Sequence, residues 1–511
     1  MIKNLKWLLL VSLTVVACSS EDSVQVEANS SDGLPLTSGT ANFTKFVSLG
    51  NSLTAGYSDN ALFVEGQKVS YTNIMAQQFA KVGGGEFKIP FMADNVGGFK
   101  VGGTVFATAR LASTGGGAPT AVAGTPSTEI LTSIAAAGPY NNCGVPGAKS
   151  FHLLSPTYGS PLGIAGGTAN PYYVRFAPAN GTTSVVAYAA AQAPTFFSLW
   201  IGNNDVLGYA TTGGDGSNPI TPSAGPAGVG FDATYDAIVN TMTSGANAPK
   251  GVVANIPYVN TVPFFTFIAA NPVPLVAAQA AQLNPLFQGL NAILASQGQP
   301  ARFQLLTASS SNPLLIADKT LTFDATVLFA TALQGAPFNF DAATAGFLGS
   351  LYGKSRHAVA SGAARDYVLL SSGGLIGTTQ PGFPATNSTR GVTYPMPDSA
   401  ILTATEVAIV KTATDAYNAK IRAVATAKGL AFVDANALLS QIAASGVSAN
   451  GFTVSSSFIV GGGFSTDGVH PSPRGYAVIA NKFIEAINLK YGSNLKGVDL
   501  GNYRILFPKS L

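Results

Sequence analysis

Three side chains in the sequence have the chemistry of an activated nucleophile. Ser52 lies in the turn sequence GNSLT at residues 50–54, and Asp467 and His470 lie together in FSTDGVHPSPRGY at residues 464–476. The spacing lets the carboxylate of Asp467 reach back to Nδ1 of the imidazole in the same loop and fix its tautomer. Nε2 of His470 is then free to take the proton of a serine hydroxyl, which would make Ser52 nucleophilic.

The remaining histidines give no sign of a second reactive centre. His152 and His357 are not spaced with each other or with carboxylates in a metal-ligand pattern, and we expect a structural role for His152 rather than a place in a pocket. Arg356, next to His357, is expected to lie on a solvated face. A lone serine in a glycine-flanked turn is usually a helix cap, so the case for Ser52 depends on its partners. The sequence implies no metal and no cofactor.

Four short blocks occur along the chain in the order in which they occur in the SGNH, or GDSL-like, hydrolases. They are GNSLTAG at residues 50–56, NCGVPG at 142–147, GNND at 202–205 and DGVH at 467–470. Each block alone is weak evidence, but the four in this order are strong evidence, and the chain therefore resembles that family. The resemblance covers the two ends of the segment 41–495 and leaves the long intervals between the blocks unmatched.

The resemblance implies a role for each block. Ser52 would attack the acyl carbon of an ester, His470 would act as base and then as acid, and Asp467 would orient His470. The oxyanion would be held by the backbone N–H groups of Ser52 and Gly147 and by the side-chain amide of Asn204. Neutral donors placed in advance stabilise the charge of a tetrahedral intermediate without reorganising, and each is typically worth about 2.7 to 4 kcal/mol.

One residue departs from the family pattern. Asn51 stands where the family has an Asp, which is not the acid of the triad, so the departure affects hydrogen bonding in the turn rather than the mechanism. Other serine-hydrolase plans fit less well, because the chain contains no G-x-S-x-G elbow. The chain order Ser52, Asp467, His470 also differs from those of the subtilisin-like and chymotrypsin-like proteases, which disfavours a protease.

The elements that must position these residues follow from apolar runs and helical periodicity. Strands are predicted at 45–49, 195–201, 251–256 and 430–434, and helices from 71, over 231–242, from the capping pair Thr403 and Glu406 to about 428, and after Pro473. This alternation predicts a parallel sheet covered by helices. With the resemblance, it indicates a three-layer α/β/α, flavodoxin-like SGNH hydrolase domain over 41–495, with insertions at roughly 206–230 and 260–400 and a tail at 496–511.

The stretch that leads into the second insertion is unusual in composition. Between Gly251 and Ala301 there is no Asp, Glu, Lys, Arg or His. The prolines of this stretch leave no run near the roughly 20 residues of a membrane-spanning helix, namely Pro257, Pro263, Pro272, Pro274 and Pro285. Packing in the core is the favoured interpretation. The alternative is an apolar cap in which Phe264, Phe265 and Phe267 offer surface to an acyl chain.

The N-terminus predicts export and lipid anchoring. Two lysines precede an apolar run over residues 8–17 that ends at Cys18, which is typical of a signal peptide at 1–17. Residues 15–18 resemble a bacterial lipobox, with Cys18 lipidated, and the alternative is an ordinary signal peptide cut near Ala17. Residues 18–40 are polar and are predicted to form a flexible tether. We expect a lipid-anchored protein of the cell envelope, in the outer membrane, with the periplasmic and surface faces both left open.

Composition excludes some partners. Charged residues make up 10% of the chain, the formal net charge is +3, and no basic run is interleaved with aromatic residues, so nucleic acid is not expected as a partner. The expected activity is hydrolysis of carboxylic esters, with lipid acyl esters or acetylated glycans as substrates. The alternative from a different class is a catalytically silent surface lipoprotein that binds lipid or glycan.

Overall fold

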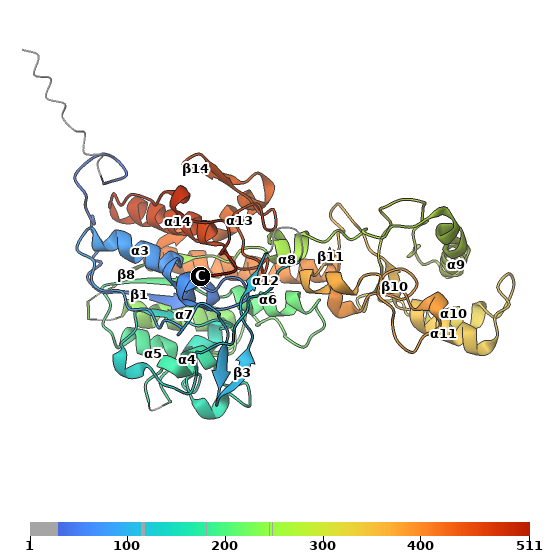
Figure 1. Ribbon diagram of the computed structural model, residues 1–511, viewed down its shortest axis with the longest axis horizontal. Helices are drawn as coiled ribbons and strands as arrows, with labels where there is room; N and C mark the ends of the chain where they lie inside the picture. The colour runs from blue at the N-terminus through green and yellow to red at the C-terminus, as the bar shows by residue number, and fades with distance from the viewer. Residues whose placement is uncertain (1–28, 114–117, 180, 245, 248) are drawn as a thin grey trace, which may run out of the picture.

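A five-stranded parallel sheet forms the centre of the larger part of the molecule (Figure 1). The computed structural model describes residues 29–511 except 114–117, 180, 245 and 248, so the predicted signal peptide and Cys18 lie outside the described residues. The strands lie in the order β13 (Ala431–Val433), β8 (Lys250–Ala254), β7 (Phe196–Trp200), β1 (Phe46–Gly50) and β6 (Asn142–Gly144). The α/β class with a parallel sheet is confirmed.

Helices flank this sheet because its strands are apolar on both faces. β1 and β7 are buried along their whole length, as strands are when helices cover both sides. In Figure 1, α3 and α14 lie above the sheet and α5 and α7 below it. The bounds are α3 (Tyr71–Ala80), α5 (Val185–Ala190), α7 (Phe231–Thr243), α12 (Ala404–Ala427) and α14 (Pro473–Tyr491).

The predicted helix starts are confirmed at the level of their caps. The side chain of Ser70 accepts a hydrogen bond from the N–H of Asn73 at the start of α3. Thr403 and Glu406 form the expected capping box at the start of α12, with Glu406 Oε2 accepting from Thr403 N at 2.8 Å. Pro473 is the first residue of α14, where its missing N–H costs no helical bond.

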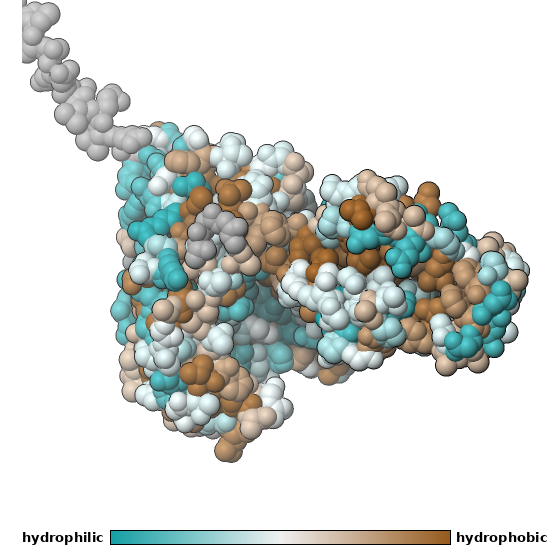
Figure 2. Space-filling view, turned by 45° about the vertical axis from the view of Figure 1, so that its right-hand side comes forward, coloured by the Kyte–Doolittle hydropathy of each residue, from teal (hydrophilic) through white to brown (hydrophobic). Residues whose placement is uncertain are grey.

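Residues 268–401 form a second lobe with its own apolar core (Figure 1). Phe287, Leu290, Phe329 and Tyr352 are buried there. The lobe holds α9 (Ala277–Ser296), α10 (Thr326–Ala332), α11 (Ala342–Tyr352) and the antiparallel pair β9 (Leu315–Ala317) and β10 (Ser355–His357). Short elements join it to the body, namely α8 (Pro263–Thr266), β11 (Tyr367–Val368) and β12 (Ile401–Leu402). Figure 2 shows apolar surface gathered over the lobe and its junction with the body.

The body also contains several shorter helices and strands. They are the helices α1 (Ser52–Ala55), α2 (Val64–Lys68), α4 (Pro171–Phe176), α6 (Asn203–Thr211) and α13 (Ala435–Ala444), with the short antiparallel strands β2 (Phe99–Val101), β3 (Thr104–Ala107), β4 (Leu111–Ala112), β5 (Thr120–Ala121), β14 (Val447–Ala449) and β15 (Phe452–Val454). The elements that matter for the site are α1, α6 and α13, because each follows a sheet strand directly.

The structure differs from two of the expectations. The prolines were expected to prevent a helix of about 20 residues in the uncharged segment, but α9 is 20 residues long and contains Pro285 on its exposed face. Among the residues that the structure describes, no helix combines the length and apolarity needed to cross a bilayer. In the described part of the predicted tether, Ser31 N donates to Asn494 O at 2.9 Å and Thr40 N to Tyr491 O at 2.8 Å, so this part packs against the end of α14 and the residues after it. Residues 18–28 of the predicted tether lie outside the described residues.

Candidate active site

Ser52 lies at the carboxyl end of β1, an interior strand of the sheet, where open parallel sheets bind ligands. It is the first residue of α1 and follows β1 through Asn51, whose side-chain oxygen caps the helix by accepting from Leu53 N at 3.0 Å. Gly50 is required at the end of the strand, because a Cβ there would lie 2.2 Å from Oγ1 of Thr54. The sequence therefore folds into a tight strand-to-helix turn that places Ser52 at the rim of the sheet.

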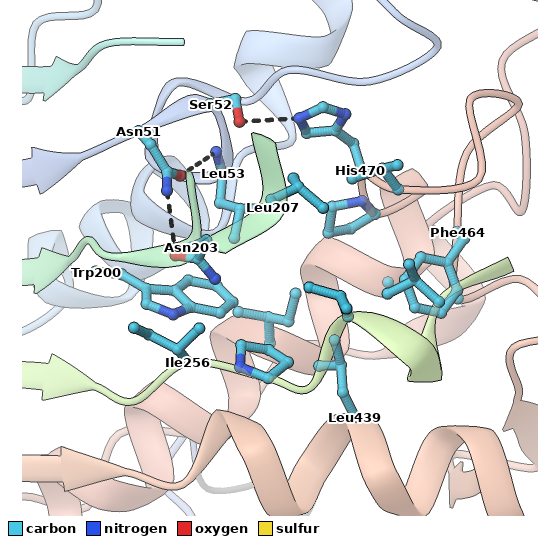
Figure 3. A pocket seen from close by; sticks show the side chains of 18 of the residues that line it. Asn51, Ser52, Leu53, Trp200, Asn203, Leu207, Ile256, Leu439, Phe464 and His470 are labelled. Carbon is cyan, nitrogen blue, oxygen red and sulfur yellow. Dashed lines mark hydrogen bonds between the residues drawn. The ribbon is translucent and has the colours of Figure 1, made fainter. Parts of the chain in front are cut away.

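The departure at Asn51 is accommodated by a neighbouring amide. Asn51 Nδ2 donates to Oδ1 of Asn203 at 3.1 Å, so the turn after β1 is linked to the turn after β7 (Figure 3). A carboxylate at position 51 could not donate this bond. Asn51 thus has a structural partner of its own, and the three predicted triad residues are unaffected by the difference.

Ser52, His470 and Asp467 form a continuous hydrogen-bonded relay. Nε2 of His470 lies 2.8 Å from Oγ of Ser52 (Figure 3). Nδ1 of His470 lies 2.9 Å from Oδ2 of Asp467. Burial alone would raise the pKa of Asp467, but the charge of His470 and hydrogen bonds from His470 and Val469 lower it to about 2. An ionised carboxylate only accepts, so Nδ1 carries the proton and Nε2 presents its lone pair to the serine hydroxyl.

The conformation of the loop around His470 explains how Asp467 reaches the imidazole ring three residues further along the chain. Oδ1 of Asp467 accepts the backbone N–H groups of Val469 and His470, both at 2.8 Å, which closes a turn that presents Oδ2 to the ring. Ser465 N donates to His470 O at 2.8 Å and closes the loop from the other side. Gly468 takes a φ of +73°, a conformation that disfavours any residue with a side chain.

Asp59 and Asn60, which sequence reasoning missed, hold this loop in place by hydrogen bonds. Asn60 N donates to Oδ2 of Asp467 at 2.8 Å, the same oxygen that accepts from His470. Asp59 N donates to Oγ of Ser465 at 3.0 Å, and Oδ1 of Asp59 accepts from Thr466 N at 3.1 Å. Residues 59 and 60, which follow α1, therefore share one hydrogen-bond network with the histidine loop, although more than four hundred residues separate them in the sequence.

Asp59 is itself paired with a buried cation. Nη1 of Arg110 lies 3.6 Å from Oδ2 of Asp59, and both side chains are only 1% exposed. Burial raises the pKa of Asp59 to about 6, against the lowering effects of the Thr466 hydrogen bonds and of Arg110. Nη2 of Arg110 donates to the carbonyls of Pro508 and Lys509 at 2.6 and 3.1 Å, so the C-terminal segment packs beside this network.

The predicted oxyanion donors are brought close together only in part. Ser52 and Asn204 line the same cavity, whereas Gly147 is not among its lining residues. Gly147 is nevertheless adjacent to Ala148, whose carbonyl accepts from Nδ2 of Asn204 at 2.9 Å. This bond uses one of the two amide N–H groups of Asn204. Within the described residues, the N–H groups of Ser52 and Gly147 donate to no protein acceptor.

The cavity beside Ser52 is apolar over most of its wall (Figure 3). It encloses about 750 Å³ of space between the lining atoms, part of which is open to solvent. The alternative of a cap made by Phe264, Phe265 and Phe267 is not supported, because none of them lines the cavity: Phe265 is fully buried, and Phe267 is 57% exposed and packs on Phe458. The preceding segment, residues 256–262, contributes to the wall instead.

His152 and Arg356 make hydrogen bonds, ring contacts or ion pairs within the fold. Nδ1 of His152 accepts from Lys149 N at 3.0 Å, and its ring stacks on Tyr158, which agrees with the structural role expected for it. Arg356 is not on a solvated face: its guanidinium lies 2.6 Å from Asp318 and 2.6 Å from Asp366, and the prediction failed because the two acids lie 38 and 10 residues away along the chain.

The chemistry of the site therefore rests on the serine relay and the cavity. Within the described part of the chain, no group of His, Cys, Asp and Glu side chains is arranged to hold a metal ion. No protein-family model matches the chain, and neither curated proteins nor solved structures gave a match.

Proposed function

We propose that the protein is a serine ester hydrolase of the SGNH type, with the three-layer α/β/α fold of that family and large insertions. The observation that carries the proposal is the relay from Ser52 Oγ through both nitrogens of His470 to Asp467, at 2.8 and 2.9 Å. This is the geometry that activates a serine hydroxyl, with the base oriented by a third group. The four blocks of the resemblance supply the same residues in the same roles.

The first half of the reaction forms an acyl-enzyme. The Ser52 hydroxyl gives its proton to Nε2 of His470 while Oγ attacks the carbonyl carbon of the ester. The carbonyl oxygen becomes an oxyanion, and the N–H groups of Ser52 and Gly147 and the second amide N–H of Asn204 stabilise it. Asp467 stabilises the imidazolium that forms. His470 then gives the proton to the leaving alkoxide, the C–O bond breaks, and a neutral alcohol departs.

The second half repeats these steps with water. His470 takes a proton from a water molecule, whose oxygen attacks the acyl carbon of the Ser52 ester. The second tetrahedral intermediate collapses as His470 returns the proton to Oγ of Ser52, which releases the carboxylic acid. No step needs a metal or a cofactor, since the proton shuttles within the triad.

The proposal includes anchoring of the enzyme to a membrane through lipidated Cys18. Two acyl chains on the cysteine and a third on its amino group would bury many methylenes, each worth about 0.8 kcal/mol. The reaction would then take place in the cell envelope, in the outer membrane, on esters of lipids or of acetylated glycans.

Hydrolysis of p-nitrophenyl esters by the parent protein and by Ser52→Ala tests the activity. We expect the parent to release p-nitrophenol and Ser52→Ala to lose at least a thousandfold in kcat. Ser296→Ala serves as the matched control, because Ser296 is an exposed serine at the end of α9 in the other lobe. Equal and negligible hydrolysis by the parent and Ser52→Ala would favour the silent lipid-binding or glycan-binding lipoprotein instead.

A further inference from the structure

We propose that the cavity beside Ser52 binds the acyl chain of the substrate, so that the enzyme acts on esters of apolar acids several carbons long rather than on acetyl esters. This inference rests on the proposed hydrolase function and specifies its substrate class. It follows from the walls of the cavity, the state of its polar atoms and the order in which the two products leave.

The deep wall of the cavity is built from apolar side chains of four elements (Figure 3). Trp200 and Ile256 stand at the carboxyl ends of β7 and β8, Leu439 and Ile442 lie on α13, and Ile479 lies on α14. All lining residues that the structure describes are uncharged, apart from any charge that His470 takes up during the reaction. Such a wall stabilises methylene groups, and it has no charged side chain that could pair with an ionic group.

Several polar groups of the wall already have partners within the protein, apart from the Ser52 N–H and the second amide N–H of Asn204, which face the oxyanion position. Nε1 of Trp200 donates to Asn255 O at 3.0 Å, so the indole presents its apolar ring to the cavity. The amides of Asn51 and Asn203, which also line the cavity, bind each other at 3.1 Å. A sugar ring placed in the deep part would lose its hydrogen bonds to water without replacing them, which is costly. The deep part therefore favours a hydrocarbon chain over a glycan.

The two halves of the ester are distinguished by when they leave. The alcohol must depart after the first step, and its oxygen must lie near Nε2 of His470 to receive the proton. The acyl group stays covalently attached to Ser52 until water attacks. We therefore place the acyl group against the buried residues Trp200 and Ile256, because it must be held beside Ser52 after the alcohol has left.

The apolar wall extends over several elements beside the nucleophile. Leu439 and Ile442 of α13 and Ile479 of α14 line the same cavity as Ser52. An acetyl group carries only one methyl group beyond its carbonyl, so each added methylene can bury more of this wall.

The test compares two series of esters. In the first series the acyl chain lengthens from acetate to decanoate with p-nitrophenol constant, and in the second the alcohol lengthens from methanol to decanol with acetate constant. For the parent protein, kcat/KM is expected to rise about fourfold for each methylene from acetate to hexanoate, on the order of 10² in all. The alcohol series is expected to change far less.

Variants of α13 locate the effect. Ile442→Phe fills the cavity and is expected to lower the decanoate-to-acetate ratio of kcat/KM at least tenfold, while Ile442→Ala shifts the best chain to a greater length. Ala443→Phe places the same ring on the exposed face of the same helix and is expected to leave the profile unchanged. Thermal melting checks that each variant is folded, and Leu439→Phe repeats the test from the adjacent wall position if Ile442→Phe does not fold.

The possible outcomes separate the inference from the proposed function. Fastest hydrolysis of acetate that still requires Ser52 would overturn the acyl cavity and leave the hydrolase intact. A dependence on alcohol length alone would also overturn it, because the cavity would then bind the leaving group. If no ester in either series is hydrolysed in a way that depends on Ser52, the proposed function itself fails.

Discussion

Replacement of Asp467 by asparagine disturbs the relay without changing the shape of the side chain. Asp467 accepts four hydrogen bonds: Oδ1 from the N–H groups of Val469 and His470, and Oδ2 from Asn60 N and Nδ1 of His470. An amide has one oxygen and one NH₂ group. In either orientation of the amide in Asp467→Asn, the NH₂ group therefore faces two donors.

The size of the loss in kcat depends on which two N–H donors the new NH₂ group faces. If the new oxygen keeps the two backbone bonds, the NH₂ group faces Asn60 N and Nδ1 of His470, and the ring can escape the conflict only by moving its proton to Nε2. That tautomer cannot take the proton of Ser52, and the corresponding change in a Ser-His-Asp triad lowers kcat by about 10⁴. The N–H of Asn60 also loses its acceptor, but Asn60 is exposed and water can take the acceptor's place, so the loss is expected to cost about 0.5–1.5 kcal/mol of folding stability.

Steady-state hydrolysis of a p-nitrophenyl ester and chemical denaturation of the same samples measure both effects. We expect Asp467→Asn to lose about 10⁴ in kcat with little change in KM, since the substitution leaves the cavity wall intact. Asp499→Asn is the matched control, because Asp499 is an exposed helix cap and asparagine caps helices as well as aspartate does. Activity of Asp467→Asn within tenfold of the parent would refute the tautomer reasoning.

Three further outcomes are expected. Asn204→Ala removes one oxyanion donor and should lower kcat by about 10² to 10³ in the ester assay; an unchanged kcat would remove Asn204 from the site. Asp59 has a pKa raised from 3.8 to about 6, so its contribution to stability is present below pH 4 and lost as pH rises through about 6. Denaturation of the parent and of Asp59→Asn should therefore show the parent gaining about 2–3 kcal/mol relative to the variant between pH 7.5 and pH 4, and a constant difference would contradict this. Cys18→Ser should abolish incorporation of radiolabelled palmitate and release the protein from membranes, and equal labelling of both forms would exclude lipidation at Cys18.

The sequence predicted the sheet and the relay because their signals are local. Apolar runs such as residues 195–201 mark buried strands, and the pair Thr403 and Glu406 satisfies backbone donors within a single turn. Asp467 and His470 contact each other within one loop, so their spacing alone indicates the contact. The contact with Ser52 depended on the order of the blocks, since no local pattern joins residues 418 positions apart.

The parts that were missed depend on contacts between distant segments. Asn60 supports Asp467 through a backbone N–H, and every residue except proline has that group, so its side chain carries no signal. No local pattern marks Arg110, because its partners are distant in the sequence: Asp59 precedes it, and the carbonyls of Pro508 and Lys509 lie near the C-terminus. The favoured interpretation of the uncharged segment was packing in the core, which the burial of Phe265 supports, and the sequence did not identify the residues that form the apolar wall.

Trapping of the acyl-enzyme tests the central claim most directly. The protein is mixed with p-nitrophenyl hexanoate, quenched in acid within the first turnover and measured by intact-protein and peptide mass spectrometry. We predict a hexanoyl adduct on the peptide that contains Ser52, and no adduct on Ser52→Ala under the same conditions. Hydrolysis of the ester without any adduct on Ser52, or with an equal adduct on Ser52→Ala, would contradict the account.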